Sequence, residues 1–205
     1  MDISQALIDI LRATHLTCFA AGMGTSLYFD FRTFITLNEP IDSNEVLGLT
    51  RIHTWIALAF GGLWVTGIAL IYIRTAFDIS SFSPKLWLKI GVMVFMVWNA
   101  RKIGKTIIPL LDKNVGSALI DLPASRLVGA TQLGVNSMFC WTVGLLLGSS
   151  LAVKTATWEF LLPMAIIWFV TLTLIGQAMI LVIRLKKSGY FKEEPALHAQ
   201  PSDRP

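Results

Sequence analysis

The chain has 205 residues, of which 54% are hydrophobic and only 15% are charged, and its mean hydropathy is +0.64. A soluble domain of this length cannot bury so much apolar surface, so a lipid bilayer must cover much of it. The net charge is +4, but the basic residues stand beside the ends of apolar stretches, where they set topology and meet anionic lipid. A membrane protein is therefore predicted, and no nucleic-acid partner is expected.

Five apolar stretches approach the roughly 20 residues that a helix needs to cross the hydrocarbon core. In chain order they are 13–29, 52–73, 86–104, 127–153 and 158–183. The third is the weakest, because Lys89, Arg101 and Lys102 shorten its uncharged part. We predict an all-α, integral membrane helical bundle of about five transmembrane helices. It forms a single domain over residues 1–187 and is followed by a disordered cytoplasmic tail over 188–205.

The basic residues also predict how the helices are oriented. The loops after the first and third stretches, together with the C-terminal region, hold twelve of the 17 Lys and Arg residues. The opposite side holds the other five, which are Arg12, Arg74, Lys85, Lys89 and Lys154. Since cytoplasmic segments carry the excess of basic residues, we expect the N-terminus outside and the C-terminus inside, in a bacterial inner (cytoplasmic) membrane.

His15 and Gly22 are seven residues apart in the first stretch, so they share one face of a helix with Cys18 and Ser26 beside them. Neutral imidazole is a common metal ligand, and haem iron takes an axial histidine. A glycine on the same face leaves space for a flat macrocycle. The pattern indicates a ligand or catalytic site at His15. Alternatively, Gly22 only allows close helix packing, and His15 is hydrogen-bonded near the interface.

Lys89 enters the third stretch from the outside and is predicted to lie at the depth of His15. An ionisable side chain inside a span is costly and usually marks a ligand site, a proton path or a partner contact. If Lys89 faces His15, its ammonium group can bind a substrate carboxylate or take part in proton transfer. Alternatively, its stem lies along the lipid and its ammonium group reaches the headgroups.

His53 begins the second stretch from the cytoplasmic side. A span of about 20–30 Å separates it from His15 at 1.5 Å per residue, so the two histidines are not expected to bind one haem together. His53 either binds a cofactor at a second site or shuttles protons at the inner surface. Alternatively, it pairs with Asp30 as part of the structure.

Small and polar residues recur along one side of the fourth stretch. They are Gln132, Asn136, Cys140, Gly144 and Gly148. This spacing predicts a face turned into the bundle, whose amides hydrogen-bond to other helices, as do those of Asn99 and Gln177. No acidic residue lies deep in a predicted span, which argues against a cation-coupled permease.

Three segments in the first half of the chain carry a family resemblance. They are His15-Leu-Thr-Cys-Phe-Ala-Ala-Gly22-Met-Gly24 with its ending Tyr28-Phe-Asp30-Phe-Arg32, Trp64-Val-Thr66-Gly67-Ile-Ala-Leu70, and Leu86-Trp87-Leu88-Lys89-Ile-Gly-Val. They resemble CopD-like and HemJ-like bacterial membrane proteins and related uncharacterised families. HemJ-type enzymes are b-haem proteins that oxidise protoporphyrinogen and depend on a first-helix histidine and a third-helix lysine. The resemblance implies these roles for His15 and Lys89.

The chain departs from that pattern in its second helix, which has no clear counterpart of an Arg-Pro-containing stretch. It also lacks the further histidine just after the third-helix lysine. CopD-like proteins are associated with copper uptake, but the chain has no Met-rich or His-rich copper motif.

The leading hypothesis is a haem b membrane oxidoreductase in porphyrin or quinone redox chemistry, similar to protoporphyrinogen oxidase. In it His15 is the axial metal ligand or base, Lys89 is the charge partner, and Gly22 makes room for the macrocycle. One alternative is a non-catalytic protein that assists assembly or packs in a homo-oligomer or larger membrane complex. The other is a small-solute or metal permease.

Overall fold

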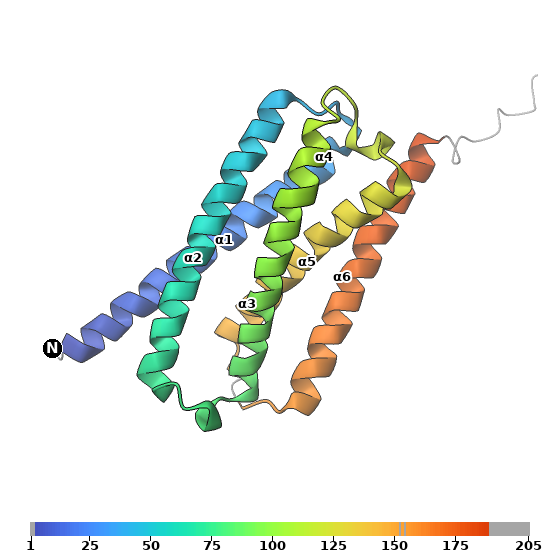
Figure 1. Cartoon of the computed structure of the whole chain (residues 1–205). Coiled ribbons are helices and arrows are strands. Elements are labelled where there is room, and N and C mark those ends of the chain that lie inside the picture. The colour runs from blue at the N-terminus through green and yellow to red at the C-terminus, as the bar shows by residue number, and fades with distance from the viewer. Residues whose placement is uncertain (1–2, 152, 154, 189–205) are drawn as a thin grey trace, which may run out of the picture.

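The computed structural model describes residues 3–151, 153 and 155–188, and all regular elements in these residues are helical. Five long helices dominate the chain (Figure 1). They are α1 (Ile3–Ile35), α2 (Ser43–Thr75), α3 (Pro84–Lys102), α5 (Ala124–Ser149) and α6 (Trp158–Lys187). The α3 helix continues through the π-helical segment η3 (Ile103–Ile107) into the short helix α4 (Ile108–Asp112). The all-α prediction is confirmed, whereas the predicted tail beyond residue 188 lies outside the described residues.

Local sequence signals explain where the second and third helices begin. At the start of α2, the Asp42 carboxylate accepts a hydrogen bond from the Asn44 backbone N–H, and the Glu45 carboxylate accepts one from the Asp42 N–H. This reciprocal pair is a capping box. Hydrogen bonds to the Asp42 carboxylate hold the pKa of that group below its ordinary value. The bond from the Asn44 backbone N–H has the largest effect. At α3, the Ser83 hydroxyl caps the helix and Pro84 occupies its first position.

Four of the helices are long and apolar enough to cross a membrane, namely those within Ser4–Asn38, Ser43–Thr75, Ala124–Ser149 and Trp158–Lys187. The α3 helix does not join them, because its basic residues lower its hydropathy, so five spans remain a prediction. The helices do not end where the apolar stretches end. The first continues past residue 29 to Ile35, and the helix of the fourth stretch ends at Ser149, although Val153 in the following loop is still buried.

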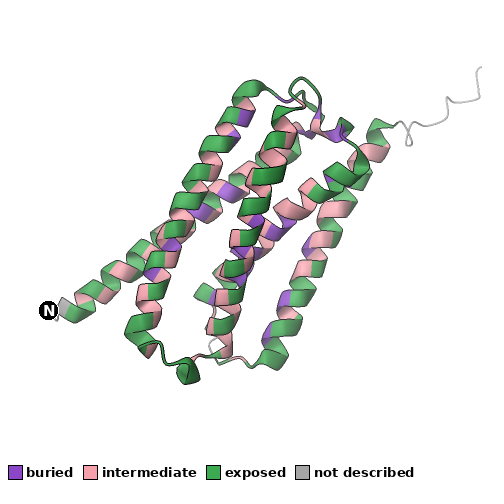
Figure 2. Cartoon of the chain, viewed as in Figure 1, coloured by how far each residue is buried: buried purple, intermediate pink, exposed green. Residues whose placement is uncertain are grey.

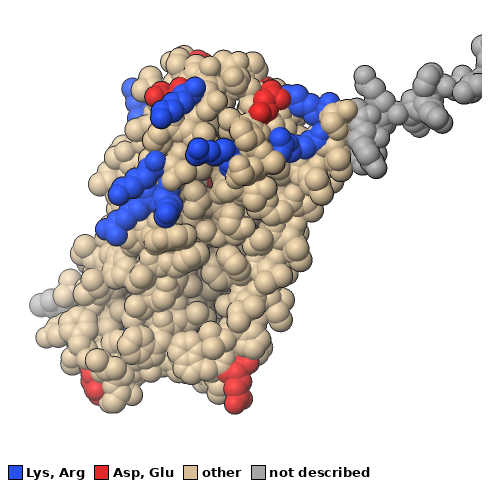
Figure 3. Space-filling view, turned by 45° about the vertical axis from the view of Figure 1, so that its right-hand side comes forward, with Lys and Arg blue, Asp and Glu red and all other residues tan. Residues whose placement is uncertain are grey.

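Two loops meet at one end of the bundle. They contain the three-residue 3-10 helices η1 (Thr36–Asn38) and η4 (Leu119–Asp121). The Ile41 N–H donates to the Ser117 carbonyl at 3.0 Å, and the Gly116 N–H donates to the Ile41 carbonyl at 2.9 Å. The last turn of α6 joins them, because Lys187 Nζ lies 2.6 Å from Asp121 Oδ1. Lys and Arg side chains gather toward this end on the face in Figure 3, and we call it the basic end.

The helices form two groups, which meet where α1 packs against α5 and where α2 packs against α4. The α1 helix packs mainly against α2, and α3 and α6 both pack against α5, while α1 also lies against α5. Figure 2 shows the buried residues on the inward sides of the helices and exposed residues on their outer sides. The main core cluster comes from four helices and the loop after α5: Leu63, Val92, Met96, Cys140, Trp141, Val143, Leu147, Val153 and Leu161.

Amide side chains hydrogen-bond between α3, α5 and α6, as the spacing in the sequence predicted. Asn99, which is 1% exposed, donates to the Leu133 carbonyl at 3.0 Å and accepts from Asn136 Nδ2 at 3.2 Å. Gln132 Nε2 donates to Asn136 Oδ1 at 3.0 Å and to Thr173 Oγ1 at 3.3 Å. These bonds align three helices inside an apolar interior, where an amide group without a hydrogen-bond partner lowers the stability of the fold.

Replacing Asn99 by alanine is expected to destabilise the fold by about 1–2 kcal/mol, because it leaves the Asn136 amide buried without its acceptor. The measurement is reversible unfolding in mixed micelles. Asn38→Ala is the matched control, because Asn38 is exposed at the basic end and should cost less than about 0.5 kcal/mol. Equal effects of both substitutions would contradict the proposed contribution of this network.

Candidate functional site

His15 lies between α1 and α2, where a two-step chain of hydrogen bonds holds its ring. Its Nδ1 is 2.8 Å from Thr66 Oγ1, and the Thr66 hydroxyl lies 2.7 Å from the Gly62 carbonyl oxygen. The carbonyl can only accept, so a Thr66 hydroxyl that donates to Gly62 accepts from His15. In that arrangement the Nδ1 atom carries the proton and Nε2 keeps its lone pair. Among the described residues, Nε2 has no hydrogen-bond partner.

Glycines of α2 let α1 approach closely at this point. A Cβ atom at Gly62 would lie 2.6 Å from Cys18 Sγ, which is closer than atoms pack. A Cβ atom at Gly67 would lie 3.5 Å from His15 Cε1, which is ordinary contact. The ring of His15 thus packs against the α2 backbone at Gly67, and its orientation is set by Thr66 on the same helix. Such a bond to the second ring nitrogen is how proteins orient histidine ligands.

Two further polar groups lie on α2 and α3. Lys89 on α3 is half-buried, and its charge acts on His15. Trp64 on α2 lies two residues before Thr66, and its buried Nε1–H has no acceptor among the described residues. The structure thus brings Lys89 within electrostatic range of His15, and it adds a buried indole donor that the sequence did not single out.

Gly22 lies against the side chain of Trp141 on α5. A Cβ atom at Gly22 would lie 2.5 Å from Cη2 of Trp141, whose side chain is 1% exposed. Phe19 packs edge-on against the same indole, with ring centroids 5.4 Å apart. In this packing the Trp141 ring fills the space beside Gly22, and the role of Gly22 in a cofactor site stays a prediction. Gly22 allows α1 to approach α5.

His53 lies far from His15 and packs against a different element. A Cβ atom at Gly104, in the π-helical segment η3, would lie 3.3 Å from His53 Nε2. Thirteen positions along α2 separate His53 from Thr66, about 20 Å at 1.5 Å per residue, so His53 and His15 cannot share one metal. The alternative pairing of His53 with Asp30 is also wrong, since neither makes a hydrogen bond or ion pair with the other.

Asp30 is the residue that sequence reasoning missed. The first apolar stretch was ended at residue 29 because a charge follows it, but α1 continues to Ile35. One carboxylate oxygen of Asp30, Oδ2, is buried without a partner among the described residues, and Oδ1 lies 3.8 Å from the position of a Cβ atom at Gly134 on α5. The helical spacing from Phe19 through Gly22 and Ser26 to Asp30 was the signal that could have found it. An acidic side chain does therefore lie inside the bundle.

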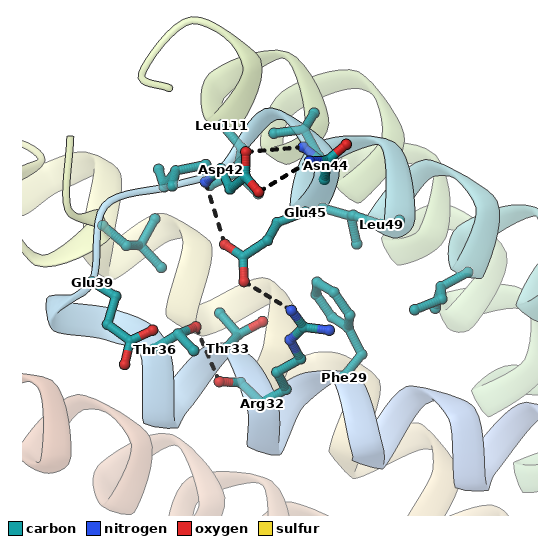
Figure 4. Close-up of a pocket in the computed structure, with 15 residues that line it drawn as sticks. Phe29, Arg32, Thr33, Thr36, Glu39, Asp42, Asn44, Glu45, Leu49 and Leu111 are labelled. Carbon is teal, nitrogen blue, oxygen red and sulfur yellow. Dashed lines mark hydrogen bonds and ion pairs between the residues drawn. The ribbon is translucent and has the colours of Figure 1, made fainter. Parts of the chain in front are cut away.

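A separate cavity of about 200 Å³ opens at the basic end (Figure 4). It lies between the end of α1, the start of α2 and α4, and its charged lining residues are Arg32, Glu39, Asp42 and Glu45. Arg32 Nη2 donates to Glu45 Oε1 at 2.9 Å across it. Exposed ion pairs of this kind contribute little stability. None of the residues that the sequence singled out for chemistry lines this cavity.

Comparisons of the chain with models of protein families, with curated proteins and with solved structures find no match. The resemblance to CopD-like and HemJ-like proteins thus stays a prediction, and the function must be argued from the residues themselves. Those residues define a helical bundle with an oriented imidazole, a half-buried lysine and a buried indole N–H on neighbouring helices.

The packing role of Gly22 can be tested against its neighbour Gly24. Gly22→Ala should destabilise the protein by about 1–3 kcal/mol, because the buried Trp141 ring has no space to move. Gly24→Ala is the matched control, because nothing lies within 4 Å of its Cβ position, and it should be neutral or stabilising by up to about 1 kcal/mol. Thermal unfolding in detergent measures both. If Gly22→Ala is as stable as Gly24→Ala, the described α1–α5 contact is wrong.

Proposed function

We propose that the chain is a multi-pass protein of the bacterial inner membrane that carries out porphyrin or quinone redox chemistry at His15, with Lys89 as the charge partner. The single observation that supports it best is the bond from His15 Nδ1 to Thr66, which leaves Nε2 free to bind iron or accept a proton. The orphaned Trp64 N–H adds a donor for an acceptor oxygen, such as a quinone carbonyl or a porphyrin carboxylate. Lys89 supplies positive charge for the same kind of oxygen.

A haem b fits this site in one respect and not in another. The oriented imidazole of His15 suits an axial ligand, and a haem held there would supply one-electron redox chemistry. A haem ring cannot pack against Gly22 while the Trp141 ring covers that glycine. The proposal therefore assigns binding to His15, Trp64 and Lys89 alone, with Thr66 fixing the imidazole. His53 is left out, because it lies about 20 Å along α2 from this site.

The charge distribution supports the proposed orientation. Basic residues gather toward the end where the loops after α1 and α4 and the last turn of α6 meet. Since this is the pattern of a cytoplasmic face, the N-terminus lies outside and α6 ends inside. His15 and Lys89 then lie toward the outer half of the membrane.

One specific observation favours the alternative of a packing or assembly protein. Gly24, Gly61 and Gly91 have open space where a Cβ atom would stand, so they serve no contact within the described part of the chain. Glycines facing outward allow a helix of another subunit to approach closely. In that case the chain belongs to a homo-oligomer or a larger membrane complex, and His15 only links α1 to α2.

A dithionite-reduced minus oxidised visible spectrum distinguishes the two functions. The protein purified in mild detergent from haem-replete cells should show a b-type α-band at near-stoichiometric haem. His15→Ala should abolish the band while the protein still folds, because the axial ligand is lost. The matched control His53→Ala should retain it. A featureless spectrum for the unmodified protein would leave quinone binding as the only form of the redox proposal, tested by whether His15→Ala prevents photolabelling by an azidoquinone. Absence of both signals would leave the assembly function.

The Thr66 hydroxyl gives a second test that does not remove the ligand itself. Thr66→Val should weaken haem binding by about 10–100-fold, because the imidazole loses the acceptor that orients it. Thr66→Ser keeps the hydroxyl and should restore binding to within about threefold of the unmodified protein. Haem titration of the apoprotein measures the affinities, and equal affinities for Val and Ser would show that the hydroxyl has no part in the site.

A further inference from the structure

We propose that Asp30 is a proton-binding site, whose carboxyl group holds a proton while α1 is packed against α5. This inference does not rest on the redox function, because it concerns a different contact toward the basic end of the bundle. It follows from three observations: the burial of the carboxyl oxygen Oδ2, the absence of a partner for that oxygen among the described residues, and the series of contacts that holds Asp30 in place.

Asp30 is the last of four consecutive contacts that α1 makes with α5. Phe19 lies over Gly144, and Gly22 lies under Trp141. Ser26 Oγ is 3.1 Å from Ser137 Oγ. Asp30 then faces Gly134, whose Cβ position would lie 3.8 Å from Oδ1, an ordinary contact distance. Along these four contacts the residue numbers rise on one face of α1 and fall on one face of α5, as expected for antiparallel helices. Asp30 is therefore held in the interface by the three turns before it.

No charged group balances the Asp30 carboxyl among the described residues. Oδ2 is buried, and no ion pair or hydrogen bond from these residues reaches it. The nearby ionisable groups on the helices around it are engaged elsewhere or turned outward. Arg32 bonds to Glu45, His53 packs on Gly104, Arg101 is exposed, and Lys102 lies over the Trp98 ring. On α5, no ionisable residue lies between Arg126 and Cys140.

An ionised carboxylate in these surroundings would lose its hydration and gain no counter-charge. Adding a proton removes the charge and leaves a neutral acid that Gly134 and its surroundings can accommodate. Releasing the proton must then draw water or a cation to Oδ2, or move α1 away from α5. Asp30 thereby links proton release to the contact between α1 and α5. A group that does this is a proton carrier or a pH-sensitive contact of the membrane interior.

Infrared spectroscopy of the full chain in lipid nanodiscs tests the proposal directly. With aspartate labelled by ¹³C at its side-chain carboxyl, the unmodified protein at pH 7 should show the C=O stretch of a protonated aspartic acid. Exposed aspartates are ionised there, since their ordinary pKa is about 3.9. The band should vanish in Asp30→Asn and persist in Asp9→Asn, where Asp9 is exposed beside Arg12. If the unmodified protein lacks the band at pH 7, Asp30 is ionised and the proposal is overturned.

Thermal stability gives an independent test in case the label is weak. If folding keeps the proton on Asp30, the unmodified protein must lose stability as the pH rises from 5 to 9, because the unfolded chain gives up that proton at lower pH. Asp30→Asn cannot ionise, so its melting temperature should change less over this range and exceed that of the unmodified protein at pH 9. Asp9→Asn should follow the unmodified protein. Parallel curves for Asp30→Asn and the unmodified protein would contradict the proposal.

Discussion

The close approach of α1 to α5 is the contact on which the rest of this bundle depends. The Trp141 ring lies over Gly22, where no Cβ atom could stand, and Phe19 packs against the edge of that ring. Together with the packing of α2 against α4, this contact joins the α1–α2 pair to the group of α3, α5 and α6. It also fixes how α1 is rotated. With Gly22 against α5, His15 faces α2 and Asp30 faces Gly134, so both ionisable groups of α1 depend on it.

The side chains of His15 and Asp30 differ in their hydrogen bonds. His15 is held by one bond through Nδ1 and keeps a free nitrogen, which suits it to binding a ligand or a proton. Asp30 has a buried oxygen without any partner, which suits the neutral acid. Lys89 and the Trp64 N–H lie on the helices that flank His15, and neither lies near the amide network of α3, α5 and α6. That network satisfies its own polar groups and therefore serves alignment of the helices.

Apolar length and amide spacing in the sequence were enough to predict the helices and the bonds of Asn99 and Asn136. They could not predict the role of Gly22, because a glycine on a helix face indicates close approach without saying whether a cofactor or Trp141 approaches. Asp30 was missed for another reason. A charge at the end of an apolar stretch indicates a helix boundary, whereas α1 continues to Ile35 and its contacts with α5 bury Oδ2 of Asp30. The pairing of His53 with Asp30 failed because sequence distance gives depth in the membrane but not the rotation of each helix.

The state of the His15 ring is the most direct test of the site. Nitrogen-15 NMR of histidine-labelled protein in lipid nanodiscs, with His15→Ala used to assign the signals, reports which ring nitrogen carries the proton. The bond from Nδ1 to Thr66 predicts a neutral ring protonated at Nδ1, with an unprotonated Nε2, and predicts that Thr66→Val removes this preference. A ring protonated at Nε2 instead, or one unaffected by Thr66→Val, would contradict the account of His15 as an oriented ligand or base.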